Sequence, residues 1–183
     1  MHTPGSDDAA TRREVPSRLH RHAGDGWVEC TFGPDAGPHR HWGLYGAAGL
    51  MLVRRSAAGA VTDVVLQHRA LWSHEGGTWG VPGGALDAGE DAVTGALRES
   101  WEEAGIDPHE VRVVGTYVLD HGVWTYTTVV GEVADGADVV PAATDPESLA
   151  VRWVPLDELD ALPLLPAFAA ALPALRDVLA AVA

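Results

Sequence analysis

Residues 83–106 read GGALDAGEDAVTGALRESWEEAGI. Four of its residues are Glu, in a chain whose 12 Lys+Arg and 26 Asp+Glu give a net charge of −14. Glu99, Glu102 and Glu103 lie one, three or four positions apart, so on a helix they project together. Like charges at this spacing weaken a helix by about 0.2–0.5 kcal/mol per pair, so their presence needs a reason.

A carboxylate cluster on a helix has three interpretations. Most runs of charged residues simply form the solvent-exposed face of a helix. A carboxylate pair can also act as general acid and base, as in glycoside hydrolysis. Finally, carboxylate oxygens bind Mg²⁺ or Mn²⁺, and the bound ion offsets the repulsion. The spacing alone does not choose, but Gly83 and Gly84 precede the helix, where a backbone without side chains can turn tightly and offer a carbonyl to an ion.

The flanking residues complete a longer pattern, G-x5-E-x7-R-E-U-x-E-E-x-G-U, in which U is usually a bulky apolar residue. Its members here are Gly84, Glu90, Arg98, Glu99, Glu102, Glu103, Gly105 and Ile106. Seven fixed letters at fixed spacing arise by chance at roughly one in 10⁸ positions. The pattern closely resembles the signature of the MutT/Nudix hydrolase superfamily. Ser100, at the first U, departs from it in a way that affects helix packing rather than chemistry.

The resemblance covers roughly residues 43–175 and implies an α/β fold, an α/β/α sandwich with a mixed β-sheet. Apolar and β-branched runs between turn residues predict strands at about 47–53, 61–67, 111–119, 123–132 and 151–154. Helices are predicted from Glu90 or Asp91 to Ala104 and within 166–182. We expect the hydrolase domain to span 43–183. Residues 1–42 are polar and rich in Pro, Gly and His, which predicts a partly disordered arm.

The resemblance also implies a role for each residue of the signature. Glu99 and Glu103 are expected to be the main metal ligands, and Glu102 to bind a second ion or to bind through water. The carbonyl of Gly83 would complete the coordination of the metal. Arg98 and Glu90 would orient the ligands rather than touch the ion.

A carboxylate after the signature is expected to supply a further metal ligand or to activate water. Glu147 is the first candidate for the general base, ahead of Glu99, and Asp145 and Asp120 are held in reserve. The predicted catalytic group is therefore Glu99, Glu102, Glu147 and Arg98.

Mg²⁺, with Mn²⁺ as a substitute, is the implied cofactor, because divalent ions let an acidic protein bind an anionic diphosphate. The implied substrate is a nucleoside diphosphate linked to a group X. Markers of the NADH and ADP-ribose types are missing, and Tyr117 and Tyr126 match the dinucleoside-polyphosphate type poorly. This favours MutT-like hydrolysis of a nucleoside triphosphate to a monophosphate and pyrophosphate. The alternatives are an ADP-ribose or other nucleoside-diphosphate-sugar pyrophosphatase, and a non-catalytic module that senses nucleotides.

Several residues outside the signature are candidates for binding substrate. Arg69 and His74 are expected to contact phosphate, and Trp79, Trp72 or Trp124 to stack on the base. A further hypothesis places His121, in the turn 119–122, over the site. Trp42, Trp153 and the C-terminal helix are interpreted as core or as the face of a homodimer.

Cys30 is the only cysteine, which excludes a disulfide within the chain. Zinc binding by Cys30, His39 and His41, with His20 or His22, is disfavoured because zinc sites usually have paired Cys or His spacings. A flexible arm is the favoured interpretation, and the sequence does not assign the arm or Cys30 a role.

The strong negative charge disfavours binding to nucleic acid or to an anionic membrane. The N-terminus does not resemble a signal peptide, and no apolar run is long enough for a membrane span. We therefore expect a cytoplasmic protein.

Overall fold

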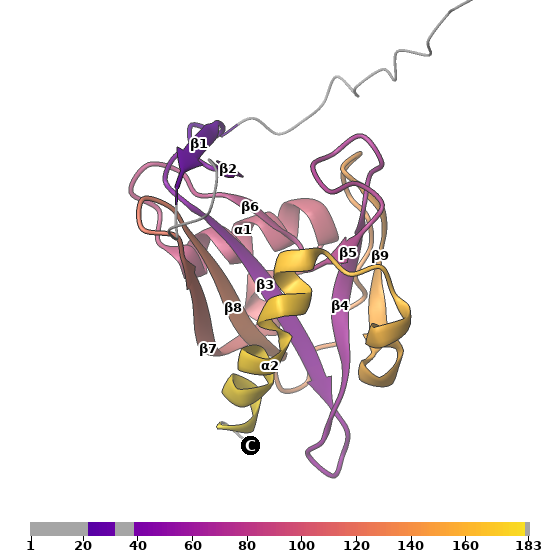
Figure 1. Cartoon of the computed structure of the whole chain (residues 1–183). Helices are drawn as coiled ribbons and strands as arrows, with labels where there is room; N and C mark the ends of the chain where they lie inside the picture. Colours follow the sequence, from indigo (N-terminus) through magenta and orange to yellow (C-terminus); the bar gives the residue numbers. More distant parts are fainter. Residues whose placement is uncertain (1–21, 32–38, 182–183) are drawn as a thin grey trace, which may run out of the picture.

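The computed structural model describes residues 22–31 and 39–181. A seven-stranded sheet has the order β5-β4-β3-β8-β7, with β6 paired to β3 and β9 paired to β4. Helix α1 (Ala92–Ala104) lies behind this sheet and α2 (Pro166–Ala180) in front of it, which confirms the expected α/β/α sandwich (Figure 1). The strands are β3 (Ala47–Arg55), β4 (Val61–Arg69), β5 (Trp79–Gly80), β6 (Gly83–Ala85), β7 (Val111–Asp120), β8 (Thr125–Val133) and β9 (Ser148–Pro155). Two short 3₁₀ helices are η1 (Pro108–Glu110) and η2 (Leu156–Ala161).

Strand β3 lies at the centre of the fold and explains the continuous apolar run of its sequence. It runs parallel to β8 and antiparallel to β4 and β6, so the sheet is mixed, as expected. Leu50 and Leu52 belong to the core beneath α1, whereas Met51 and Val53 belong to the core beneath α2. Because helices cover both faces of the sheet, the residues of β3 from Ala47 to Val53 are apolar on both faces, without polar residues between them.

Helix α1 begins and ends where the sequence predicts. The carboxylate of Asp91 caps its first turn by accepting from the N–H groups of Val93 and Thr94, both at 3.0 Å. At the other end, the N–H of Gly105 donates to the carbonyl of Trp101 at 3.1 Å. Gly105 has a φ of +66°, the left-handed conformation that ends a helix and that glycine adopts without steric cost.

Ser100, the departure from the signature, is fully buried on the sheet-facing side of α1. Its hydroxyl donates to the carbonyl of Leu97 at 3.0 Å, within its own helix. The buried hydroxyl is therefore satisfied without a partner in the sheet, so helix packing tolerates a polar residue at this position.

The longer strands and the last helix lie close to their predicted positions, but β5 and β6 were not predicted. Both are short, and residues 83–85 are Gly, Gly and Ala, which give no alternating pattern. β6 forms because its glycine backbone can approach β3 closely, with Gly84 opposite Ala48 and Gly83 opposite Gly49.

The described part of the polar N-terminal segment differs from the expected arm without regular structure. Strands β1 (Trp27–Cys30) and β2 (His39–Trp42) pair antiparallel, and the hairpin lies at the top of the molecule in Figure 1. The N–H of Gly43 donates to the carbonyl of Gly26 at 2.7 Å, and the N–H of Leu44 donates to the carbonyl of Gly24 at 2.8 Å. Backbone hydrogen bonds hold these short strands, and hydrophobic periodicity in the sequence does not predict them. The rest of the expected arm, 1–21 and 32–38, lies outside the described residues.

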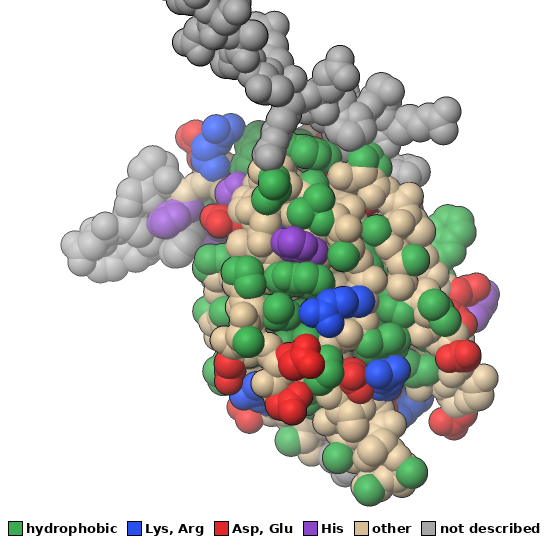
Figure 2. Space-filling view, turned by 90° about the vertical axis from the view of Figure 1, so that its right-hand side faces the viewer, with side chains coloured by type: hydrophobic (Ala, Val, Ile, Leu, Met, Phe, Trp, Pro, Cys, Tyr) green, Lys and Arg blue, Asp and Glu red, His purple; other side chains and the backbone are tan. Residues whose placement is uncertain are grey.

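The surface mixes charges of both signs. On the face shown in Figure 2, basic side chains are scattered among acidic and apolar ones. Within residues 22–31 and 39–181, no helix has both the length and the apolar character that crossing a bilayer requires.

The left-handed cap of α1 gives a testable prediction. Gly105→Ala should lower the free energy of unfolding by about 1–2 kcal/mol, because a Cβ is strained at a φ of +66°. Gly105→Asn is the matched variant, and it should lose less because asparagine tolerates this conformation. Urea denaturation of the three proteins checks the order, and an equal loss in both variants would contradict this account of the cap.

Candidate active site

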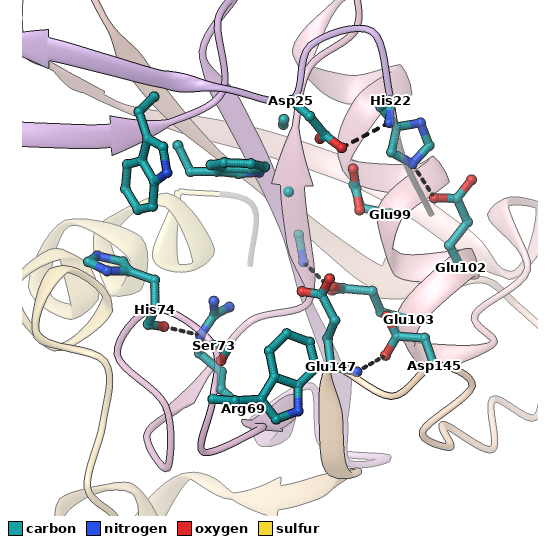
Figure 3. Close-up of a pocket in the computed structure, with 16 residues that line it drawn as sticks. His22, Asp25, Arg69, Ser73, His74, Glu99, Glu102, Glu103, Asp145 and Glu147 are labelled. Carbon is teal, nitrogen blue, oxygen red and sulfur yellow. Dashed lines mark hydrogen bonds and ion pairs between the residues drawn. The ribbon is translucent and has the colours of Figure 1, made fainter. Parts of the chain in front are cut away.

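A cavity of about 700 Å³ opens where α1 and β6 face the loop after β4, the loop before β9 and the β1–β2 hairpin. Carboxylates gather on one side of it, and Arg69 and His74 lie across from them (Figure 3). The lining residues are His22, Asp25, Trp27, Trp42, Arg69, Trp72, Ser73, His74, Gly83, Gly84, Ala85, Glu99, Glu102, Glu103, Asp145 and Glu147. The structure thus brings together most of the site residues that the sequence predicts.

The two glycines of β6 position the carboxylates of α1. A Cβ at Gly84 would lie 2.7 Å from the carboxyl atoms of Glu99, so a larger residue would displace that carboxyl group from its observed position. The N–H of Gly83 donates to Oε2 of Glu103 at 2.9 Å. The observed role of Gly83 is therefore to fix a glutamate through its N–H, while metal binding by its carbonyl stays a prediction.

Arg98 contacts the carboxylates that it is predicted to orient. Its Nε and Nη2 donate to the two carboxylate oxygens of Glu90 at 2.9 and 2.8 Å, and Nη2 also donates to the carbonyl of Ala85 at 3.0 Å. Its Nη1 donates to Glu99 at 2.8 Å and to Glu102 at 3.3 Å. Hydrogen bonding between Arg98 and Glu90 raises the pKa of the arginine and lowers the pKa of the carboxyl, so both stay charged.

Glu99 and Glu103 are buried, with only 6% of each residue exposed. Burial raises the pKa of Glu99 to about 7, although the charge of Arg98 opposes this. Burial, followed by the charges of Glu99 and Asp145, raises the pKa of Glu103 well above its usual range. Burying two neighbouring carboxylates in their charged form costs folding free energy unless a cation accompanies them.

The donor atoms of this cluster fit a hard divalent cation. Single ligand atoms of Glu99, Glu102 and His22 lie within 4.8 Å of one another. Carboxylate oxygens are the ligands that Mg²⁺ and Mn²⁺ prefer. His22 adds a nitrogen donor, and its Nε2 lies 3.1 Å from Oε2 of Glu102. The sequence pattern missed His22 because it lies about sixty residues before the signature begins at Gly84, in a segment without periodicity.

Glu147 and Asp145 reach the cavity because their loop is bonded to the end of α1. The N–H of Thr144 donates to the carbonyl of Glu103 at 3.1 Å. Asp145 accepts from the N–H of Glu147 at 3.1 Å, and the carbonyl of Glu147 accepts from the N–H of Ala70 at 2.7 Å. The resulting arrangement places both carboxylates beside Glu103 (Figure 3).

The opposite wall contains two aromatic residues that the sequence reasoning missed. Trp27 and Trp42 meet edge to face with ring centroids 5.3 Å apart, and Trp27 contacts His74 in the same way at 5.5 Å. Trp42, which we interpreted as core or dimer face, is 41% exposed and lines the cavity. Arg69, His74 and Trp72 line the cavity, as expected of substrate-binding residues.

Trp79, in contrast, does not line the cavity. It is buried in the core beneath α2, where its ring stacks on His68 with centroids 4.6 Å apart. Trp124 is also buried, and its Nε1 donates to the carbonyl of Gly43 at 3.1 Å. Both were candidates for base stacking on composition alone, and their burial leaves no face for a base.

Two other candidates also lie outside the cavity lining. Asp120 uses its carboxylate to accept from the N–H of Gly122 at 2.7 Å in the β7–β8 turn. His121 contacts His41 instead of overhanging the carboxylates, with 3.0 Å between Nδ1 of His121 and Nε2 of His41.

Helix α2, which we interpreted as core or dimer face, contributes to the core through Phe168, Leu172 and Leu175, among others.

Comparison with known proteins agrees with this site. Residues 44–176 match the family model of the NUDIX domain. The chain belongs to the Nudix family. It is 46% identical over 159 residues to the putative 8-oxo-dGTP diphosphatase 3 of Mycobacterium tuberculosis, an alignment that covers 84% of this chain and 69% of that protein.

Two further relatives support the assignment of this chain as a Nudix hydrolase. A nucleoside triphosphate pyrophosphatase/Nudix hydrolase fusion protein of Bifidobacterium longum is 52% identical over 145 residues. That alignment covers 79% of this chain but 29% of the fusion protein, so the chain spans under a third of that relative. The crystal structure of RenU, a Nudix hydrolase from M. smegmatis, has a TM-score of 0.73 at 42% identity and covers 87% of this chain and 98% of its own.

The raised pKa of Glu99 predicts how the metal-free protein responds to pH. Between the ordinary value of 4.5 and about 7, the folded state binds more protons than the unfolded state, so stability falls as pH rises. The contribution is at most about 3–4 kcal/mol, from 1.36 kcal/mol for each of about 2.5 pKa units. Urea denaturation in the presence of a chelator should show this fall, and Glu99→Gln should flatten it. An unchanged slope in the variant would contradict the burial of an ionisable Glu99.

Proposed function

We propose that this Nudix hydrolase cleaves a nucleoside triphosphate in the presence of Mg²⁺, releasing a nucleoside monophosphate and pyrophosphate. The observation behind the proposal is the division of one cavity into a carboxylate wall, from α1 and the loop before β9, and a wall containing Arg69 and aromatic rings. Its volume of about 700 Å³ lies in the range of small-molecule sites. A nucleotide matches these two walls, because it has an anionic phosphate chain at one end and an aromatic base at the other.

At the carboxylate wall, we assign Glu99, Glu102 and Glu103 to the metal. A bound divalent ion would neutralise phosphate oxygens and make water a better nucleophile near neutral pH. Arg98 holds Glu99 and Glu102 in place and is itself fixed by two bonds to Glu90. The protein therefore fixes its ligands in advance and needs little reorganisation when the substrate binds.

Glu147 is our candidate for positioning or activating the attacking water. Its backbone is bonded to Ala70 on one side and to Asp145 on the other, so its position depends on both the end of β4 and the loop before β9. It lies beside Glu103, near where a metal-bound diphosphate would lie (Figure 3). A carboxylate there can accept a proton from water, provided that it is ionised.

At the opposite wall, we assign Arg69 to the phosphate chain and Trp27 and Trp42 to the base. Arg69 is fixed by a bond from its Nε to the carbonyl of His74 at 3.1 Å. Trp42 keeps 41% of its surface exposed, so its ring is available for a base to stack on. The name of the mycobacterial relative, a putative 8-oxo-dGTP diphosphatase, favours an oxidised purine triphosphate. An enzyme of nucleotide pools would act in the cytoplasm.

A hydrolysis screen tests this proposal. Purified protein with Mg²⁺ or Mn²⁺ is assayed against nucleoside triphosphates, oxidised dGTP, ADP-ribose, NADH, nucleotide sugars and dinucleoside polyphosphates. Glu103→Gln should lower kcat by about 10²-fold or more, because it removes a charged metal ligand while keeping the shape of the side chain. The matched control is Glu158→Gln, at an exposed glutamate outside the cavity lining, which should keep wild-type activity.

The product analysis separates the alternatives. Release of pyrophosphate from a triphosphate supports the proposal, whereas cleavage confined to ADP-ribose or nucleotide sugars would replace it with the pyrophosphatase alternative. Nucleotide binding without any turnover would indicate a sensor. Comparable kcat in Glu103→Gln and Glu158→Gln would refute the assignment of Glu103.

A further inference from the structure

A second cluster of metal-ligating side chains lies outside the active-site cavity. The Sγ of Cys30 and single ring nitrogens of His41 and His121 lie within 4.8 Å of one another. Cys30 ends β1, His41 lies in β2, and His121 lies in the turn between β7 and β8. Cys30 is buried and both histidines are half-buried. The cluster therefore joins the N-terminal hairpin to the edge of the main sheet.

Strand register explains why Cys30 and His41 are neighbours. Cys30 lies opposite His39, and His41 lies opposite Val28. Directly opposed residues of an antiparallel pair project to the same face, and so do residues two apart on one strand. Cys30 and His41 therefore share one face of the hairpin as diagonal neighbours.

The third side chain reaches that face from the main sheet, and an aromatic ring supports the group. Nδ1 of His121 lies 3.0 Å from Nε2 of His41. The ring of His41 stacks on Trp124 with centroids 4.2 Å apart and planes at 13°. Trp124 is anchored by its bond to the carbonyl of Gly43. The orientation of His41 is thus set before any ligand binds.

We propose that Cys30, His41 and His121 bind one Zn²⁺ ion. Tetrahedral coordination at about 2.0–2.3 Å places ligand atoms roughly 3.3–3.8 Å apart, so atoms at the 4.8 Å limit of the cluster would close by roughly 1–1.5 Å. The two imidazole nitrogens, 3.0 Å apart, would move slightly apart. The thiol loses its proton to solvent on binding, and the ion displaces the contact between the two imidazoles.

The donor set separates this site from the carboxylate cluster. Sulfur and imidazole nitrogen suit Zn²⁺, whereas the oxygen donors of Glu99, Glu102 and Glu103 suit Mg²⁺ or Mn²⁺. A bound Zn²⁺ would connect the hairpin that holds Trp27 and Trp42 to the β7–β8 turn. The ion would therefore stabilise the aromatic wall of the cavity without taking part in hydrolysis.

Cobalt titration of the metal-free full-length chain tests the site directly. Co²⁺ substitutes for Zn²⁺, and a thiolate-to-cobalt charge-transfer band can come only from Cys30, since the chain has a single cysteine. We expect the band to saturate at one equivalent and to be displaced by Zn²⁺. Cys30→Ser should abolish it, and His121→Ala should weaken Co²⁺ binding at least about tenfold.

Two matched variants distinguish this site from other metal-binding positions. Glu103→Gln, which alters the carboxylate cluster, and His109→Ala, at an exposed histidine in η1, should both keep the band. Zn²⁺ should also raise the Tm of the wild type and of Glu103→Gln by more than that of His121→Ala, whose fold is checked by circular dichroism. Absence of the band in folded wild-type protein, or full binding in His121→Ala, would overturn the proposal.

Discussion

The close approach of helix α1 to the two glycines of β6 is the constraint on which the rest of the site depends. Gly84 leaves the space that the carboxyl group of Glu99 occupies, and Gly83 holds Glu103 through its N–H. Burial then raises the pKa of both carboxyls, so in the absence of a cation the site costs folding free energy. A divalent ion bound there would offset that cost, and this would explain why an acidic chain retains acidic residues where they repel one another.

The cavity is assembled from segments that are far apart in the sequence. Hydrogen bonds from the loop before β9 to the end of α1 bring Asp145 and Glu147 to the carboxylates. The loop after β4 supplies Arg69 and His74, and the N-terminal hairpin supplies the paired tryptophans. The carboxylate wall comes mainly from α1 and the loop before β9, whereas the other wall lies partly outside residues 44–176, the range that matches the family model.

The sequence predicted those features that depend on local patterns. The caps of α1, the apolar run of β3 and the spacing of the glutamates are all set within short stretches, so periodicity and turn residues reveal them. The role of Trp42 and the burial of Trp79 could not be predicted, because both depend on which residues pack beside them in the fold. The same applies to His22, which meets Glu102 across about eighty residues of chain. Short strands such as β1 and β6 also escaped prediction, since backbone pairing rather than hydrophobic alternation holds them.

Calorimetric titration of Mn²⁺ into the metal-free protein, repeated in buffers of different ionisation enthalpy, tests the central claim that buried carboxylates are retained for a cation. Because burial raises the pKa of Glu99 and Glu103, ion binding near neutral pH should release protons from these groups. The account predicts a buffer-dependent enthalpy in the wild type and weaker binding with less proton release in Glu99→Gln. Binding without proton release, or of equal strength in the variant, would contradict it.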